Sequence, residues 1–247
     1  MGLRKTTAVV TGAGSGIGRA TALLFATAGA NVVCADISGA EATAEAIRVV
    51  GGIASSIVLD VRRQSDWAQL VEQATGEYGG IDVLASVAGV VAPATDTAVD
   101  QDEDGWQRII DVDLKGVWLG MRAVIPGMLT AGGGRIVNVA SMAGLIGLPN
   151  LAAYSAAKGG VISLSRQTAI QYAAKNVLVN VIAPGIIETP ILGDIPDDMR
   201  VTLKSATPLG RMGRPEEIAS MIVHLAGAGG SFITGQVFAV DGGWTAQ

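Results

Sequence analysis

The sequence is poor in the residues that build covalent cross-links and metal sites, with one cysteine, Cys34, and one histidine, His224. A single cysteine excludes an internal disulfide and is compatible with a reducing compartment, so we expect a cytoplasmic location. The absence of a Cys/His cluster argues against a zinc site, and no metal is expected. Both residues lie in apolar segments, and we expect each to be structural.

Charged residues are also scarce, at 16%, and 22 acidic residues against 17 basic ones give a net charge of −5. No cluster of Lys or Arg interrupts this acidic balance, which argues against nucleic acid as a partner. Two uncharged runs, 136–157 and 218–240, contain Asn and Pro or a Gly-Gly pair, so we expect soluble strand, loop and helix pieces rather than membrane spans. The first residues run directly into a strand pattern, and no signal peptide is expected.

Apolar runs alternate with helical patterns along the whole chain. The runs predict strands at 6–12, 30–36, 55–61, 81–89, 134–141, 177–185 and 236–243. The intervening patterns predict helices at 16–28, 39–50, 65–78, 104–131, 152–174 and 215–227. Little alternation within the runs indicates strands buried on both faces. The pattern predicts an α/β fold: a single domain over residues 1–247, with a Rossmann-type doubly wound sheet of seven mainly parallel strands flanked by helices.

Three glycines, Gly12, Gly16 and Gly18, lie between the first predicted strand and the first predicted helix, in "VVTGAGSGIGRA". A merely tight turn would not need three glycines. In this strand–turn–helix context they let the backbone approach a pyrophosphate that rests on the helix N-terminus. The motif therefore predicts a dinucleotide site.

Asp36 ends the second predicted strand, 18 residues after Gly18. A carboxylate at this place accepts hydrogen bonds from an adenosine ribose diol and repels a 2′-phosphate. Neither Ser15 nor Ile37 supplies a positive charge to offset that repulsion. Although Asp36 alone is compatible with an ordinary loop carboxylate, together with the glycines it favours NAD as the cofactor.

A phenol and an ammonium lie four residues apart in "AYSAAKGG", at Tyr154 and Lys158. On a helix these side chains share a face, and a cation beside a phenol favours the phenolate. Such a pair suits a general acid or base. Considered alone, the pair is better explained by a half-buried tyrosine beside a lysine whose ammonium reaches the solvent.

Further motifs decide between these interpretations. They are Thr11–Gly18 in "TGAGSGIG", Asp60 and Val61 in "LDV", Ser141 in "NVAS" thirteen residues before Tyr154, and Pro184, Gly185, Ile187 and Thr189 in "APGIIET". In their order and spacing, over essentially the whole chain, they resemble the classical short-chain dehydrogenase/reductase family. The resemblance implies that Tyr154 is the general acid/base, that Ser141 hydrogen-bonds the reacting oxygen, and that Lys158 lowers the pKa of Tyr154 and binds the nicotinamide ribose.

The same resemblance implies the set of residues that bind the cofactor. They are Gly12, Ser15, Gly16, Ile17, Gly18, Asp36, Ile37, Asp60, Val61, Ala88, Gly89, Tyr154, Lys158, Pro184, Gly185, Ile187 and Thr189.

Two departures from the family pattern concern the site. Where the family has Asn-Asn-Ala-Gly, this chain has Ser86-Val87-Ala88-Gly89, which retains the small residues and loses the asparagines. Where the family has a fourth catalytic residue, an asparagine, this chain has Asp113, in "VDLKG". We place Asp113 in the catalytic group through its backbone carbonyl or its charge, and do not transfer the asparagine's side-chain role.

The sequence therefore favours an NAD-dependent oxidoreductase that interconverts a secondary alcohol and a ketone. The predicted substrate walls, 90–96, 142–150 and 186–199, are mainly apolar and lack Arg and Lys, which favours a small, neutral, fairly hydrophobic substrate. One alternative is a 3-oxoacyl thioester reductase, suggested by "TPLGRMGRPEE" at 207–217; such reductases usually favour NADPH, against which Asp36 argues. Another is a non-catalytic NAD-binding sensor or scaffold.

The glycines at 159 and 160 interrupt the predicted helix 152–174, at a cost of roughly 1 kcal/mol each relative to alanine. This cost indicates close packing against another backbone. The resemblance implies a homotetramer that pairs the helices 104–131 and 152–174 with those of other copies. Pro126 is expected to kink or end the first of these helices.

Overall fold

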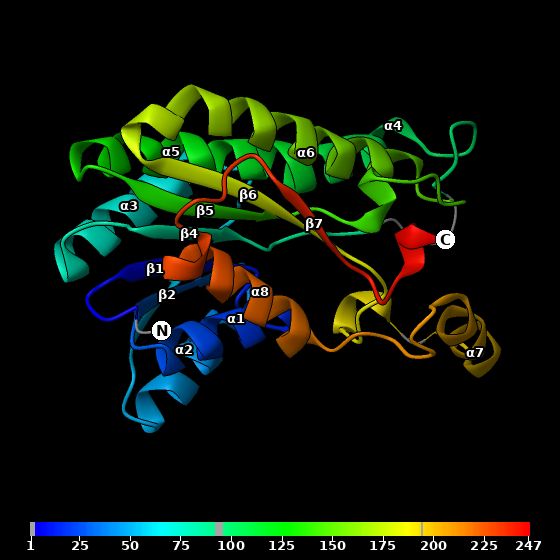
Figure 1. The fold of residues 1–247 in the computed structure, drawn as a ribbon, viewed down its shortest axis with the longest axis horizontal. Coiled ribbons are helices and arrows are strands. Elements are labelled where there is room, and N and C mark those ends of the chain that lie inside the picture. Colours follow the sequence, from blue (N-terminus) through cyan, green and yellow to red (C-terminus); the bar gives the residue numbers. More distant parts are fainter. Residues whose placement is uncertain (1–2, 92–95, 194) are drawn as a thin grey trace.

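The computed structural model describes residues 3–91, 96–193 and 195–247. Its seven strands form one parallel sheet, as the sequence predicts, and their order in the sheet is β3-β2-β1-β4-β5-β6-β7 (Figure 1). The strands are β1 Thr7–Thr11, β2 Asn31–Asp36, β3 Ile53–Val58, β4 Val83–Ser86, β5 Gly134–Val139, β6 Val177–Pro184 and β7 Val237–Val240. The strand order reverses between β1 and β4, where ligands of such sheets bind at the carboxyl ends of the strands.

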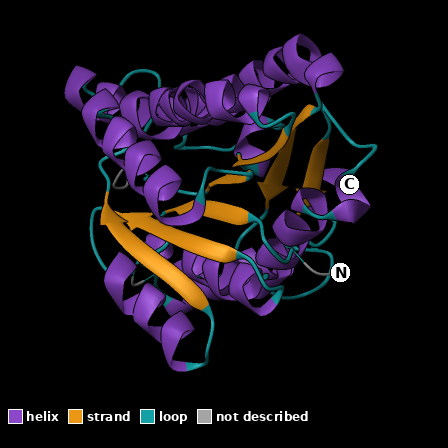
Figure 2. Cartoon of the chain, turned by 90° about the vertical axis from the view of Figure 1, so that its left-hand side faces the viewer, coloured by secondary structure: helices purple, strands orange, loops and turns teal. Residues whose placement is uncertain are grey.

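Helices cover both faces of the twisted sheet (Figures 1 and 2). They are α1 Gly16–Thr27, α2 Ala40–Val49, α3 Gln64–Tyr78, α4 Glu103–Ile110, α5 Gly116–Thr130, α6 Ala152–Tyr172, α7 Asp197–Ala206 and α8 Pro215–Ala226. One apolar core lies between the sheet and α1, α2 and α8, and a second between the sheet and α3, α5 and α6. None of the helices in the described residues is long and apolar enough to cross a membrane.

Burial differs between the inner and outer strands of the sheet. Every residue of β1, β4 and β6 is buried, as the continuous apolar runs predict. The expectation of burial on both faces is wrong for β3 and β7, because they form the two edges of the sheet and are partly exposed along most of their length. β3 also ends at Val58, so Leu59, Asp60 and Val61 follow the strand rather than belong to it.

The single helix predicted over 104–131 is interrupted in the structure. α4 continues into a π-helical turn, Asp111–Lys115, before α5 begins at Gly116. A side chain at Gly116 would lie 2.8 Å from Val61 Cγ2, so the chain approaches its neighbour closely at this point. π-helical turns of this kind occur often at functional sites. Pro126 lies inside α5 and does not end it, because the helix continues to Thr130.

The helix α7, Asp197–Ala206, was not predicted from the sequence, which assigned 186–199 to a substrate wall. It has no buried residue and extends from the body of the molecule (Figure 1). Its ten residues are mainly polar, with Met199, Val201 and Leu203 as the only large apolar ones, so no long apolar pattern marks the helix in the sequence. Its acidic first turn, Asp197 and Asp198, and the basic Lys204 in its last turn suit the helix dipole.

Candidate active site

A cleft of about 480 Å³ opens at the carboxyl ends of β1, β2 and β4. Twelve of the predicted cofactor residues line it: Gly12, Ser15, Gly16, Ile17, Gly18, Asp36, Ile37, Asp60, Val61, Ala88, Gly89 and Thr189. Of the other residues that line it, Val90, Pro190 and Ile191 belong to the predicted substrate walls, and the sequence did not assign Leu59, Arg62, Val87, Arg108 and Val112 to the site.

The glycine turn forms the floor of this cleft and leaves no room for side chains. Gly12 and Gly16 have φ angles of +69° and +48°, which favour glycine. A Cβ at Gly12 would lie 2.9 Å from the backbone of Ala88, and a Cβ at Gly18 would overlap the Gly12 carbonyl oxygen. Backbone is thus exposed to the cleft at the N-terminus of α1, and this fits the diphosphate of a dinucleotide.

Asp36 is held at the edge of the cleft by backbone amides. Its carboxylate accepts hydrogen bonds from the Gly14 N–H at 2.9 Å and from the Ser38 N–H at 3.2 Å. The adjacent Ile37 side chain is 69% exposed. A carboxylate fixed beside an exposed apolar side chain fits a ribose diol next to an adenine ring.

Asp60 is engaged by two arginines that follow it in the chain. Arg62 forms an ion pair with its carboxylate at 2.7 Å, and Arg63 lies 3.5 Å from it. The hydrogen bonds from Arg62 hold the pKa of Asp60 below its usual value, against the opposing effect of partial burial. The sequence "LDVRR" held a signal for this pair, because Arg62 directly follows Val61.

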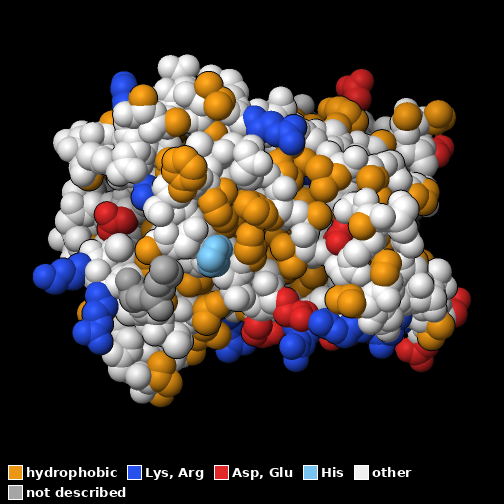
Figure 3. Space-filling model, viewed as in Figure 1, with side chains coloured by type: hydrophobic (Ala, Val, Ile, Leu, Met, Phe, Trp, Pro, Cys, Tyr) orange, Lys and Arg blue, Asp and Glu red, His pale blue; other side chains and the backbone are white. Residues whose placement is uncertain are grey.

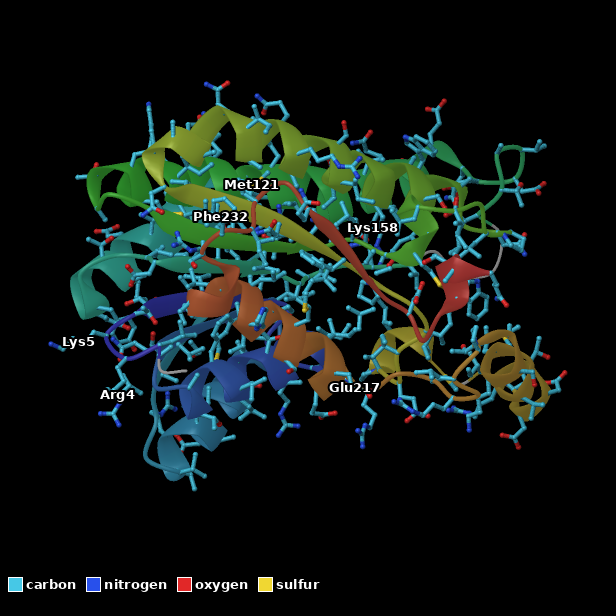
Figure 4. The ribbon with its side chains drawn as sticks, in the orientation of Figure 1. Arg4, Lys5, Met121, Lys158, Glu217 and Phe232 are labelled. Carbon is cyan, nitrogen blue, oxygen red and sulfur yellow. The ribbon has the colours of Figure 1, made fainter. Side chains whose placement is uncertain are left out.

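Two elements bring the predicted catalytic side chains together. Tyr154 and Lys158 lie one turn apart on α6, and the Lys158 ammonium is 5.5 Å from the centre of the Tyr154 ring. Figure 4 shows Lys158 on the side of α6 that faces the sheet. Ser141 follows β5 and begins a short 3₁₀ helix, Met142–Gly144, by accepting a hydrogen bond from the Ala143 N–H at 3.2 Å.

Lys158 forms a buried ion pair with Asp113, the residue that departs from the family pattern. The Lys158 Nζ and Asp113 Oδ2 are 3.2 Å apart, and their side chains are 3% and 0% exposed. Lys158 also donates to the Val139 carbonyl at 3.2 Å, and Asp113 Oδ1 accepts from the Val90 N–H at 2.8 Å. A Cβ at Gly89 would lie 3.3 Å from Lys158 Nζ, so Gly89, which lines the cleft, lies directly over this pair, although the side chains of Lys158 and Tyr154 do not line the cleft themselves.

Burial and mutual charge set the pKa values of this group. Burial raises the pKa of Tyr154 above its usual value; the Lys158 charge opposes the rise, the Asp113 charge adds to it, and the Ser141 hydroxyl lowers it. Burial disfavours the Lys158 ammonium, but the charges of Asp113 and Tyr154 outweigh this effect and the pKa of Lys158 is raised. Burial also raises the pKa of Asp113, against the Lys158 charge.

The predicted nicotinamide-side residues divide between two places. Thr189 lines the cleft, next to Gly16. Gly185 instead lies against β7, because its N–H donates to the Val240 carbonyl at 3.1 Å and a Cβ there would lie 2.7 Å from the Asp241 backbone. Pro184 and Ile187 are buried and do not line the cleft.

The remaining chemically active residues stay outside this site. Cys34 is buried in β2, and burial raises the pKa of its thiol to about 12, which makes it inert. His224 is exposed on α8. Within 3–91, 96–193 and 195–247, no group of acidic, histidine or cysteine side chains could hold a metal ion.

A glycine-lined dinucleotide cleft, with a tyrosine–lysine pair next to its Gly89, defines the class of this protein: an oxidoreductase that uses a nicotinamide dinucleotide. Residues 12–245 match the family described as Enoyl-(Acyl carrier protein) reductase. The chain belongs to the classical short-chain dehydrogenase/reductase family.

Curated relatives cover nearly the whole chain. A cis-4-hydroxycyclohexanecarboxylate dehydrogenase of Sinomonas cyclohexanicum is 44% identical over 97% of this chain and 96% of the relative. A 3-oxoacyl-[acyl-carrier-protein] reductase of Thermotoga maritima is 40% identical over 98% and 99%. A cyclohexanol dehydrogenase of an Acinetobacter species is 39% identical over 97% and 95%.

Solved structures share the whole fold. A short-chain type dehydrogenase/reductase of Mycobacterium marinum superposes with a TM-score of 0.95 at 35% identity, covering 100% of this chain and 98% of that one. A protein of Beutenbergia cavernae whose crystal holds NADP at low occupancy superposes with a TM-score of 0.93 at 37% identity, covering 100% and 99%.

Proposed function

We propose that this protein interconverts a secondary alcohol and a ketone with NAD(H), with Tyr154 as the general acid/base. The observation that carries the proposal is the convergence of three features: a dinucleotide cleft, the Tyr154–Lys158 pair at its end, and Ser141 close enough to influence the Tyr154 hydroxyl. Together they support a proton donor beside the carbonyl group that would accept the hydride.

In the proposed reaction the cofactor, when bound, supplies or accepts the hydride. The Tyr154 hydroxyl donates its proton to the carbonyl oxygen as the ketone is reduced, and its phenolate removes a proton from the alcohol in the reverse direction. The Ser141 hydroxyl hydrogen-bonds the same oxygen and stabilises its developing negative charge. Lys158, held by Asp113 and by the Val139 carbonyl, stabilises the phenolate and binds the ribose.

Two features support NAD rather than NADP. The Asp36 carboxylate is fixed by backbone amides at the place where the ribose diol fits, and it would repel a 2′-phosphate. Arg62 is a cation in the same cleft, but its charge is compensated by Asp60. NADP is bound in the structure of the Beutenbergia protein, which is a different protein. The preference of the present protein for NAD over NADP is therefore to be measured directly.

We infer that the substrate is a small, cyclic and mainly apolar secondary alcohol or its ketone. Two of the relatives are named for cyclohexane alcohols. The predicted substrate walls present partly exposed apolar side chains, with Leu145 at 41%, Ile191 at 45% and Met199 at 50% exposure. Arg200 and Lys204 follow on α7 and could meet an acidic group at the far end of a substrate.

The proposal is tested with a panel of cyclic secondary alcohols, following the absorbance of the reduced nicotinamide. We expect turnover by the unmodified protein and a loss of about 10²–10⁴-fold in Tyr154→Phe, with NADH binding retained. Tyr172→Phe, on the far end of the same helix, is the matched control and should keep full activity. A Tyr154→Phe variant that kept more than about a tenth of the rate, with chemistry limiting, would contradict the proton-donor role.

The relative from Thermotoga keeps the thioester reductase as a second candidate. A 3-oxoacyl thioester with NADPH belongs in the same panel, and a higher kcat/KM for that pair than for any alcohol with NAD would favour this candidate. NADH binding without turnover of any compound would favour a sensor or scaffold.

A further inference from the structure

Asp96 is a buried carboxylate that neither the sequence motifs nor the family comparison assigned to the catalytic group. It is 1% exposed and lies between β4 and α4 in the chain. Its Oδ1 accepts a hydrogen bond from the Ala153 N–H at 2.8 Å, and its Oδ2 accepts one from the Tyr154 N–H at 3.1 Å. Its backbone carbonyl accepts a third from the Ala152 N–H at 2.8 Å.

These three N–H groups are the first three of α6. The first N–H groups of a helix lack partners within the helix and need acceptors from elsewhere. Leu151, which precedes the helix, offers no side-chain acceptor, and the first turn of α6 carries no acidic residue. One residue 58 positions earlier in the chain therefore caps the helix that carries Tyr154 and Lys158.

The segment that ends at Asp96 begins next to the Lys158–Asp113 pair. Gly89 lies over the Lys158–Asp113 pair, and the Val90 N–H donates to Asp113 Oδ1. The chain that leaves β4 is thus attached to Asp113 near its start and to the Tyr154 backbone at Asp96. The buried carboxylate of Asp113 makes the first attachment, and the buried carboxylate of Asp96 makes the second.

We propose that Asp96 is a positioning residue for Tyr154: by fixing the backbone of the first turn of α6, it sets the place of the phenol relative to the substrate. Lys158, one turn further along, has its own attachments to Asp113 and the Val139 carbonyl, so loss of Asp96 displaces Tyr154 more than Lys158. This inference rests on the proposed alcohol–ketone reaction.

The structure offers two informative variants and a matched control. Asp96→Ala removes both side-chain acceptors, and Asp96→Asn keeps one oxygen and loses the other. Asp102→Ala is the control, because Asp102 caps the neighbouring helix α4 by accepting from the Gly105 N–H at 2.6 Å and makes no contact with Tyr154.

We expect Asp96→Ala to lower kcat by about tenfold or more, since a displacement of about 1 Å can cost 10²-fold. KM for the alcohol and the NADH dissociation constant from fluorescence should change less than about threefold, because the cleft is built by other residues. Asp96→Asn should give an intermediate kcat. Asp102→Ala should keep the kcat of the unmodified protein even if its melting temperature falls.

Amide hydrogen exchange provides a readout that needs no turnover. The segment 152–154 should exchange faster in both Asp96 variants than in the unmodified protein or in Asp102→Ala. If no compound is turned over by the unmodified protein, the proposed function fails while this measurement still tests the attachment.

Three results would overturn the proposal. They are an unchanged kcat in the folded Asp96→Asn protein, an equal loss of kcat in Asp102→Ala, and unchanged exchange over 152–154. Circular dichroism shows which variants are folded. If Asp96→Ala does not fold, the kcat and the exchange rates of Asp96→Asn test the proposal.

Discussion

The Asp113 carboxylate is fully buried and lies 3.2 Å from the Lys158 ammonium, so it adds a negative charge to the site. That charge stabilises the ammonium and disfavours the Tyr154 phenolate, so it raises the pKa of both groups. An asparagine would have the same shape without this effect.

Replacing Asp113 with Asn should therefore lower the pKa of Tyr154. Alcohol oxidation needs the phenolate, so the rising limb of kcat/KM against pH should move to lower pH. The expected shift is about one unit, which corresponds to 1.36 kcal/mol. The measurement is the pH profile of alcohol oxidation in both proteins.

The matched control is Asp111→Asn, two residues earlier in the same π-helical turn. Asp111 is partly exposed and pairs with Lys115 at 3.3 Å. Its replacement should leave the limb in place. A limb that stays fixed, or moves to higher pH, in Asp113→Asn would show that Asp113 does not act through its charge.

Asp36 is expected to set the choice of cofactor. At about 4 Å and an effective dielectric constant near 20, a carboxylate and one phosphate charge repel by at most about 4 kcal/mol. The unmodified protein should prefer NAD by at least about tenfold in kcat/KM, and Asp36→Ala should narrow that ratio by about tenfold or more. Glu45→Ala, on the exposed face of α2, is the control. Equal kcat/KM values for NAD and NADP in the unmodified protein would refute the prediction.

At the scale of elements, the short 3₁₀ helix after Ser141 is pressed against the backbone of α6. A Cβ at Gly144 would lie 2.7 Å from the Lys158 carbonyl carbon and 2.9 Å from the Gly159 nitrogen. The glycines of α6 thus serve contacts within the chain: Gly159 and Lys158 meet Gly144, and Gly160 lies against Leu114. Their cost in helix stability is explained without a partner subunit.

Gly144→Ala should separate these two elements. Overpacking of this kind costs roughly 1–3 kcal/mol, which corresponds to a fall of about 2–10 °C in Tm for a chain of this size. Turnover should fall as well, because Ser141 and Lys158 move apart. Gly147→Ala is the control in the same loop, since nothing lies within 4 Å of its Cβ. Equal Tm values for the two variants, measured by calorimetry, would refute the prediction.

At the scale of the whole molecule, large apolar side chains remain exposed on two faces. On the helical face, Trp106 of α4 is 42% exposed, Trp118 of α5 43% and Ile170 of α6 78%. Figure 3 shows hydrophobic side chains gathered on the face of α8 and β7, and the fully exposed Phe232, labelled in Figure 4, lies near β7. Extended apolar patches on a protein surface often mark interfaces.

We predict a homotetramer that uses the face of α4, α5 and α6. Light scattering at micromolar concentration should give about four times the 25.0 kDa chain mass. Trp118→Asp should shift the distribution to smaller species, whereas Val49→Asp, at the exposed end of α2, should not. A single species of chain mass in the unmodified protein would exclude the prediction.

The succession of strands and helices along the chain, and twelve of the residues that line the cofactor cleft, could be predicted from the sequence because both depend on local patterns. An apolar run of five to eight residues bounded by turn residues is typical of a strand, although it did not predict the partial exposure of the edge strands β3 and β7. The glycines at 12, 16 and 18 and the carboxylate of Asp36 are recognisable by their spacing from the first strand. The spacing of Tyr154 and Lys158 likewise identifies one helix face.

Only the tertiary structure decided what surrounds these residues. Contacts between segments far apart in the chain leave no local pattern, so the sequence did not reveal that Asp96 caps α6 or that Gly89 covers the Lys158–Asp113 pair. The sequence also failed to predict α7, because this helix is short and mainly polar and buries none of its residues. The sequence by itself determined which titratable side chains are available to the site. Burial and long-range packing decided the pKa values of these side chains and the residues with which they form hydrogen bonds and ion pairs.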